Sequence, residues 1–155
     1  MEPEQIQSEL LEAINGPNDW QSLQHLMLKL KKENSKKVLD ALLGVFFFKE
    51  NNYFRVQIGA GGLLWKLKPK YERNLREDIK RSLQNWNVSV EELPWYFAEV
   101  MGIEKVREEI KSLLTETLDE TSRKKAETYL YWLSVRNPEE FRTQLNQRWN
   151  GRLRG

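Results

Sequence analysis

The sequence predicts an all-α fold, an α-α superhelix of about four antiparallel helix pairs followed by a C-terminal helix. Helix-start signals recur near Pro3, Ser35, Pro69, Gly102 and Pro138, at spacings of 32, 34, 33 and 36 residues. Each interval is long enough for two helices and two short turns. Apolar residues repeat at helical intervals through most of the chain, and the alternation of apolar and polar residues that half-buried strands show is missing.

The first helix pair is expected at residues 4–14 and 19–33. Pro3 suits the first turn of the earlier helix, and Gly16 suits its C-terminal cap. The later helix carries one apolar stripe, which predicts burial on one side. The members of this stripe are Trp20, Leu23, Met27 and Leu30.

The second pair is expected at residues 35–48 and 53–67, with a turn at Asn51 and Asn52. Ser35 can cap the earlier helix, and residues 42–48 are apolar almost all round. A helix without a polar face must be covered on several sides, so this one should lie at the centre of the stack. The later helix has two apolar stripes, which indicates two packing neighbours.

The third and fourth pairs follow Pro69. The first helix after it places Tyr71, Leu75, Ile79, Leu83 and Trp86 on a single face. Ser89 with Glu92 forms an S-x-x-E capping box for the next helix, which should end at Gly102. Helices at residues 103–118 and 121–136 follow. Pro138 then opens a short ninth helix with Phe141, Leu145 and Trp149 at four-residue spacing, and residues 150–155 are expected to fray.

Composition favours a single cytoplasmic domain spanning residues 1–155. Cysteine is absent, which excludes disulfides, thiolate catalysis and cysteine-ligated zinc. The N-terminal residues are acidic, unlike a signal peptide. The longest apolar run, residues 38–48, is interrupted by Asp40 and is shorter than the roughly 20 residues of a membrane span. We therefore expect no membrane partner.

One segment resembles a known repeat. Phe54, Arg55 and Val56 are followed at helical spacing by small and aliphatic residues, namely Ala60, Leu63, Leu64 and Leu67, and then by Pro69. This pattern is similar to the second helix of HEAT or armadillo-type repeats, and it covers about 35 residues, while the rest of the chain shares only the period. The resemblance implies a curved helical stack used as a recognition surface, and it carries over no catalytic residue.

Helical geometry places Arg55, Gly59, Gly62 and Lys66 on one narrow face of the helix at residues 53–67. Each glycine costs a helix interior about 1 kcal/mol relative to alanine, so a compensating reason is expected. A neighbouring helix that approaches closely is one such reason. The other is a shallow groove in which a protein or peptide partner lies while the two cations bind its acidic groups.

Two pairs of aromatic residues are further candidates for a protein-binding surface. Tyr131 and Trp132 lie off the apolar stripe of their helix, and Trp95 and Tyr96 follow Pro94, where a kink is expected. Exposed tryptophan and tyrosine are typical of binding hot spots. Burial under a second neighbouring helix is the alternative for both pairs.

Basic residues support a second function, nucleic-acid binding by a helical repeat. Seven bases lie between residues 66 and 90 against three acids, and further arginines lie near the C-terminus. The candidate residues are Lys70, Arg73, Arg76, Lys80, Arg152 and Arg154. Glu72 and Glu77 stand four residues before arginines and could pair with them instead.

No catalytic, cofactor or metal site is recognised. The single histidine, His25, lacks a catalytic arrangement, and the glycines at residues 59–62 lack the lysine and hydroxyl residue of a phosphate-binding loop. We expect a non-catalytic adaptor or scaffold that binds a protein or peptide, as a monomer or a homodimer. An all-α enzyme with a site built from Glu, Lys and Tyr stays open as an alternative, as does a compact bundle without a groove.

Overall fold

The structure of the chain, a computed structural model, describes residues 1–49, 54–134 and 137–154, with side chains through residue 151. Within those ranges it contains nine α-helices and no β-strand, so the all-α prediction is confirmed. The helices are α1 (Pro3–Asn15), α2 (Asp19–Leu30), α3 (Ser35–Gly44), α4 (Phe54–Leu67), α5 (Leu75–Ser82), α6 (Glu92–Met101), α7 (Ile103–Leu113), α8 (Glu120–Ser134) and α9 (Pro138–Arg154).

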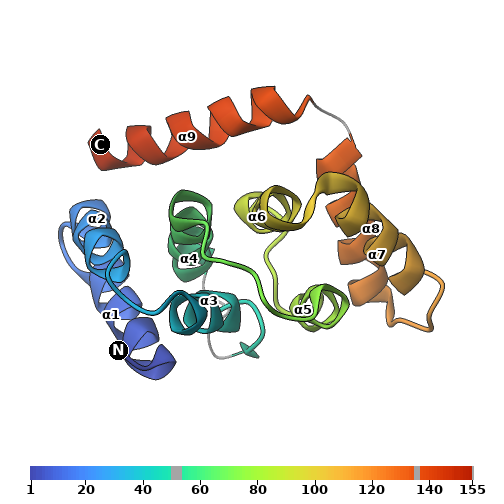
Figure 1. The fold of residues 1–155 in the computed structure, drawn as a ribbon, viewed down its shortest axis with the longest axis horizontal. Helices are drawn as coiled ribbons and strands as arrows, with labels where there is room; N and C mark the ends of the chain where they lie inside the picture. The colour runs from blue at the N-terminus through green and yellow to red at the C-terminus, as the bar shows by residue number, and fades with distance from the viewer. Residues whose placement is uncertain (50–53, 135–136, 155) are drawn as a thin grey trace.

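The first eight helices are stacked in two layers (Figure 1). In one layer α2 contacts α4, α4 contacts α6 and α6 contacts α8. In the other layer α1 contacts α3 and α5 contacts α7. The layers are joined where α1 contacts α2, α3 contacts α4 and α7 contacts α8. Three of the predicted pairs therefore lie side by side, namely α1 with α2, α3 with α4 and α7 with α8. The third predicted pair does not pack in this way, because α5 packs mainly on α7 and α6 packs mainly on α4.

The last helix, α9, departs from this stacking. It runs across the layer of α2, α4 and α6, from the end that holds α8 back to α2, which it contacts (Figure 1). It is also longer than predicted, because it continues to Arg154 where fraying was expected from Asn150. Among the described side chains, Phe141, Leu145 and Trp149 are its buried residues.

The core fills the space between the two layers. Its largest fully buried side chains come from helices of both layers and from the segments between them, and include Phe46, Trp65, Trp86, Tyr96 and Tyr129. The rings of Trp86 and Tyr129 lie 4.4 Å apart, joining the segment after α5 to α8. Trp20, predicted to belong to the core, is only half-buried.

Several helix caps and helix ends differ from the predictions. Asn34, not Ser35, caps α3 and accepts a 3.2 Å hydrogen bond from the Lys37 amide. Helix α3 ends at Gly44, before the aromatic run. Asn74 caps α5 and accepts a 3.0 Å bond from the Glu77 amide. The helix expected directly after Pro69 therefore begins only at Leu75, and Tyr71 and Trp86 lie outside it.

Two further ends concern α6 and α7. The capping box predicted at Ser89 and Glu92 is wrong, since α6 begins at Glu92 with no side-chain cap. Its end at Gly102 is confirmed: this glycine has a φ of 91°, which L side chains rarely adopt, and it alone joins α6 to α7. Helix α7 ends at Leu113, five residues earlier than predicted.

The turn expected at Asn51 and Asn52 lies outside the described residues. None of the helices in the described ranges combines the length and the apolar composition of a membrane-spanning segment.

Candidate partner-binding site

The glycine face of α4, predicted as a groove, lies inside the fold. A Cβ added at Gly59 would lie 3.0 Å from Ile14 Cδ1 and 3.2 Å from Leu10 Cδ1 of α1. A Cβ added at Gly62 would lie 2.6 Å from Cζ3 of the Trp149 ring in α9. Both glycines thus allow the chain's own helices to approach α4 closely, and the groove expected here is filled by α1 and α9.

The cations at the two ends of this face lie nearer the surface. Arg55 is exposed and forms an ion pair with Asp19 at the start of α2. It borders a pocket of about 620 Å³ whose walls include Ile14 and Phe54. Lys66 is half-buried, and no ion pair to it occurs within the described residues. The structure therefore does not bring the two cations together along an open groove.

The surface of α4 and α6 that α9 covers is called the α9-docking face, and it comprises Gly62, Trp65, Glu91, Glu92, Trp95 and Glu99. Phe141 stacks on Trp95 with ring centroids 4.5 Å apart. Trp65 Nε1 donates a 3.0 Å hydrogen bond to Asn146 Oδ1. The Trp149 ring lies against Gly62. These contacts run along one stripe of α9.

Opposite charges flank these apolar contacts. Arg142 of α9 forms an ion pair with Glu99, and this hydrogen bond raises the pKa of the guanidinium. Arg148 lies 3.4 Å from carboxylate oxygens of both Glu91 and Glu92. Helix α9 therefore presents arginines to an acidic border on α6.

Trp95 and Tyr96, candidates for exposed anchors, are buried instead. Pro94 occupies the first turn of α6, where a backbone N–H has no partner within the helix, so it need not kink the helix. The Tyr96 hydroxyl donates a 2.7 Å hydrogen bond to the Pro69 carbonyl, and burial raises its pKa. Trp95 is 3% exposed, and its Nε1 has no hydrogen-bond partner among the described residues.

Tyr131 and Trp132 of α8 are the aromatic candidates that the structure leaves accessible. Tyr131 is 57% exposed, and its ring packs edge-on against Trp132 with centroids 5.4 Å apart. Trp132 is half-buried, and its Nε1 donates a 3.0 Å hydrogen bond to the carbonyl of the exposed Val88. We call the surface formed by Tyr131, Trp132 and the adjacent Val88 the α8 aromatic patch.

A lysine lies on the same side of α8, two turns before Trp132. Lys125 Nζ donates a 3.2 Å hydrogen bond to the Gln84 carbonyl, and partial burial lowers the pKa of this ammonium group. No carboxylate pairs with Lys125 among the described residues. Lys125 and Trp132 therefore both contact the segment between α5 and α6.

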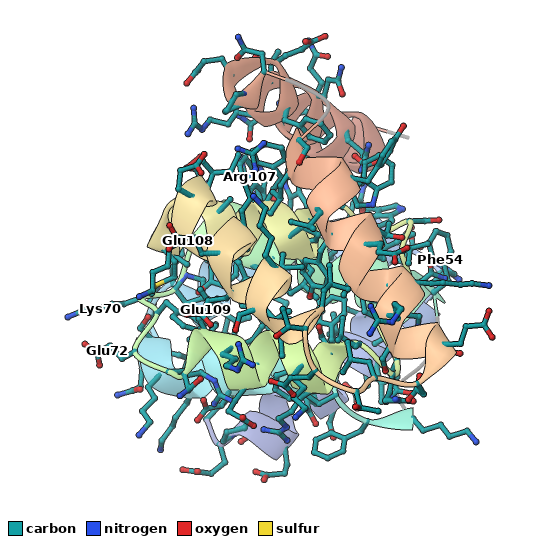
Figure 2. The ribbon with its side chains drawn as sticks, turned by 90° about the vertical axis from the view of Figure 1, so that its right-hand side faces the viewer. Phe54, Lys70, Glu72, Arg107, Glu108 and Glu109 are labelled. Atoms are coloured by element: carbon teal, nitrogen blue, oxygen red, sulfur yellow. The ribbon has the colours of Figure 1, made fainter. Side chains whose placement is uncertain are left out.

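The basic residues proposed for nucleic-acid binding are paired with acids wherever the structure describes their side chains. Lys70 pairs with Glu72 at 2.8 Å, at one edge of the molecule (Figure 2). Lys80 lies 3.1 Å from Glu116, which also pairs with Arg76. Arg76 further approaches Glu109 of α7 at 3.7 Å.

Arg73, another candidate, belongs to a cluster that the sequence analysis missed. Its Nε lies 2.8 Å from Asp78 and its Nη1 lies 2.6 Å from Asp40. The Tyr71 hydroxyl donates a 2.5 Å hydrogen bond to Asp78, which is 2% exposed. Only the acid Asp40 inside an apolar run hinted at this cluster in the sequence. The side chains of Arg152 and Arg154 lie outside the described residues.

We next consider metal binding and catalysis among the described residues. No group of three or more His, Cys, Asp or Glu among them is arranged to hold a metal ion. His25 is exposed on α2 and borders a pocket of about 320 Å³ together with Glu9 and Lys29. Glu9 is already paired with Lys29, with the two atoms 2.5 Å apart.

No protein-family model, no curated protein and no solved structure matches this chain. The resemblance of residues 54–69 to HEAT or armadillo-type repeats stays a prediction.

Proposed function

We propose that this chain is a non-catalytic adaptor of the HEAT or armadillo-like type, acting in the cytoplasm, which binds a protein or peptide through the α8 aromatic patch. One observation carries the proposal: Tyr131, 57% exposed, lies beside a half-buried tryptophan. Tyrosine and tryptophan, together with arginine, are enriched in binding hot spots. The layered stacking of α1–α8 agrees with the repeat resemblance.

The patch is pre-organised for binding. The Trp132 ring is fixed by its hydrogen bond to the Val88 carbonyl and by the Tyr131 ring beside it. Fixed side chains lose little conformational freedom when a partner binds, so more of the contact energy contributes to affinity. Both residues also project from a helix, which positions them more firmly than a loop does.

Lys125 indicates the chemistry of the partner. Its ammonium group is partly desolvated and no carboxylate in the described residues balances its charge. A partner that places an apolar side chain on Tyr131 and a carboxylate near Lys125 satisfies both. The expected ligand is therefore a protein segment that combines apolar and acidic residues.

The test compares the wild-type chain with Tyr131→Ala and with a control, Leu28→Ala. Leu28 is also exposed, at 47%, but lies on α2, at the far end of the stack. Each protein is used to capture partners from nuclease-treated native lysate, and the affinity of the purified partner is then measured. We expect Tyr131→Ala to weaken binding about 10- to 100-fold and Leu28→Ala to leave it unchanged.

Equal capture by all three proteins would contradict the proposal. The nucleic-acid alternative is measured with the same proteins, by titrating labelled DNA and RNA at about 50 mM salt. Tight binding that falls steeply as salt is added, and that does not depend on Tyr131, would favour that alternative instead.

A further inference from the structure

We propose that the α9-docking face binds α9 of a second copy of this chain, so that two molecules can exchange their C-terminal helices. The inference concerns α4, α6 and α9 and is independent of the α8 aromatic patch. It rests on three observations: the complementarity of the docking contacts, the integrity of the α1–α8 stack beneath them, and a defect in the docked arrangement.

The docking contacts form a complete recognition pattern within α9. Three anchors at four-residue spacing, Phe141, Leu145 and Trp149, face the stack, and two arginines meet its acidic border. An amphipathic helix in an apolar groove is a common mode of protein recognition, with anchors spaced in this way. The α9 of a second copy carries the same three anchors and the same two arginines. It would therefore make the same contacts with the α9-docking face as the resident α9 does.

The stack beneath α9 is continuous without it. Helices α2, α4, α6 and α8 contact one another in order, and α9 lies across them (Figure 1). Removing α9 therefore uncovers one face but breaks none of the contacts between these four helices. A face of this kind can be vacated and refilled while the rest of the fold persists.

One hydrogen-bond donor beneath the docked α9 is left without an acceptor among the described residues. Trp95, beneath Phe141, has a buried Nε1 without a hydrogen-bond partner in the described part of the chain. A buried donor that lacks an acceptor opposes the docked state, because water would satisfy it after release. The two arginines also stay about one-third exposed, so their ion pairs are partly screened.

Within one molecule, the covalent link gives the resident α9 an effective concentration in the millimolar range. The wild-type chain should therefore be monomeric at micromolar concentration. Helix exchange can be detected when a substitution weakens docking of α9 on its own molecule but leaves docking of α9 on a second molecule favourable.

Charge reversal at the ion pair of Arg142 and Glu99 creates this situation. In Arg142→Glu, residue 142 of the resident helix is repelled by Glu99. In Glu99→Arg, the resident Arg142 is repelled by the new arginine. A reciprocal exchange between the two variants pairs unlike charges at both sites.

Each full-length variant and their equimolar mixture are examined by sedimentation velocity, with circular dichroism to verify the helix content. We expect monomers for each variant alone and a 1:1 dimer for the mixture, with a dissociation constant at least about tenfold lower than for either variant with itself. The double variant carrying both reversals in one chain should return to a monomer. Arg142→Glu mixed with wild type should not dimerise, because the wild-type helix is already satisfied.

A mixture that remains monomeric while both variants keep their helix content would overturn the proposal. Hydrogen exchange at α9 then distinguishes the two remaining explanations. Slow exchange in both variants would show that α9 is a permanent cover. Fast exchange without dimers would show that the face, once vacated, is not filled by a second copy and is available to a helix of another protein.

Discussion

The packing of Trp149 on Gly62 leads to a prediction whose sign depends on the presence of the indole ring. We consider Gly62→Ala in two backgrounds, the wild-type chain and Trp149→Ala. In the wild type the added methyl group would lie 2.6 Å from Cζ3 and 2.8 Å from Cε3 of Trp149, closer than Cβ atoms pack in proteins.

Two opposing effects set the magnitude in the wild-type background. Alanine favours the helix interior by about 1 kcal/mol over glycine. Overpacking of a filled position costs about 1–3 kcal/mol. Gly62→Ala should therefore lower the free energy of unfolding by about 0–2 kcal/mol. In the Trp149→Ala background only the propensity gain remains, and the same change should raise the free energy of unfolding by about 1 kcal/mol.

The assay is a double-mutant cycle measured by urea unfolding. Trp149→Ala alone should cost about 3–5 kcal/mol, the usual range for a large aromatic side chain removed from a core. The coupling between the two positions is then about 1–3 kcal/mol. Equal effects of Gly62→Ala in both backgrounds would refute the reasoning, because they would show that the ring does not rest on the glycine.

Three further predictions concern other parts of the molecule. Replacing Arg73 with leucine leaves the carboxylate of Asp78 buried without its charged partner. The free energy of unfolding, measured by thermal and urea denaturation, should therefore fall by about 3–5 kcal/mol. A loss below about 1 kcal/mol would contradict this role of Arg73. Hydrogen bonds from Lys80 and Arg76 hold the pKa of Glu116 below its ordinary value of 4.5, so its contribution to stability is present above about pH 4.5 and is lost as the pH falls through the lowered pKa. Glu116→Gln should therefore make stability less dependent on pH in that acid range, and an unchanged acid limb of the pH profile would argue against the ion pair. Tyr131→Ala should change the unfolding free energy by no more than about 0.5 kcal/mol, as expected for an exposed side chain outside the core, and a larger loss would mean that this tyrosine supports the fold.

Sequence reasoning found the helices because their apolar periodicity is local. It placed the helix ends less well, because caps compete: Asn34 takes the cap of α3, and Ser35 instead accepts a 2.9 Å hydrogen bond from the Lys70 amide. Which of two adjacent polar residues caps a helix depends on a segment that is distant in sequence.

The same distinction holds for the candidate sites: features of a single helix could be predicted from the sequence, whereas contacts between residues far apart in the chain could not. The spacing of Gly59 and Gly62 indicated close approach or a groove, but only the path of α9 decides what covers Gly62. Arg73 and Asp40 are 33 residues apart, so nothing local pairs them. The position of Tyr131 off the apolar stripe left exposure and burial under a second helix both open, and the structure leaves this side chain 57% exposed because no second helix in the described ranges covers it.

The most direct test of the account is whether α9 lies on α4. Nuclear Overhauser effects between the Trp149 indole protons and the Gly62 α-protons report this contact in the full-length protein in solution. We expect clear cross-peaks, since the ring carbons lie against this glycine, together with slow hydrogen exchange at the α9 amides. Absent cross-peaks, together with fast hydrogen exchange at the α9 amides, would contradict the central claim.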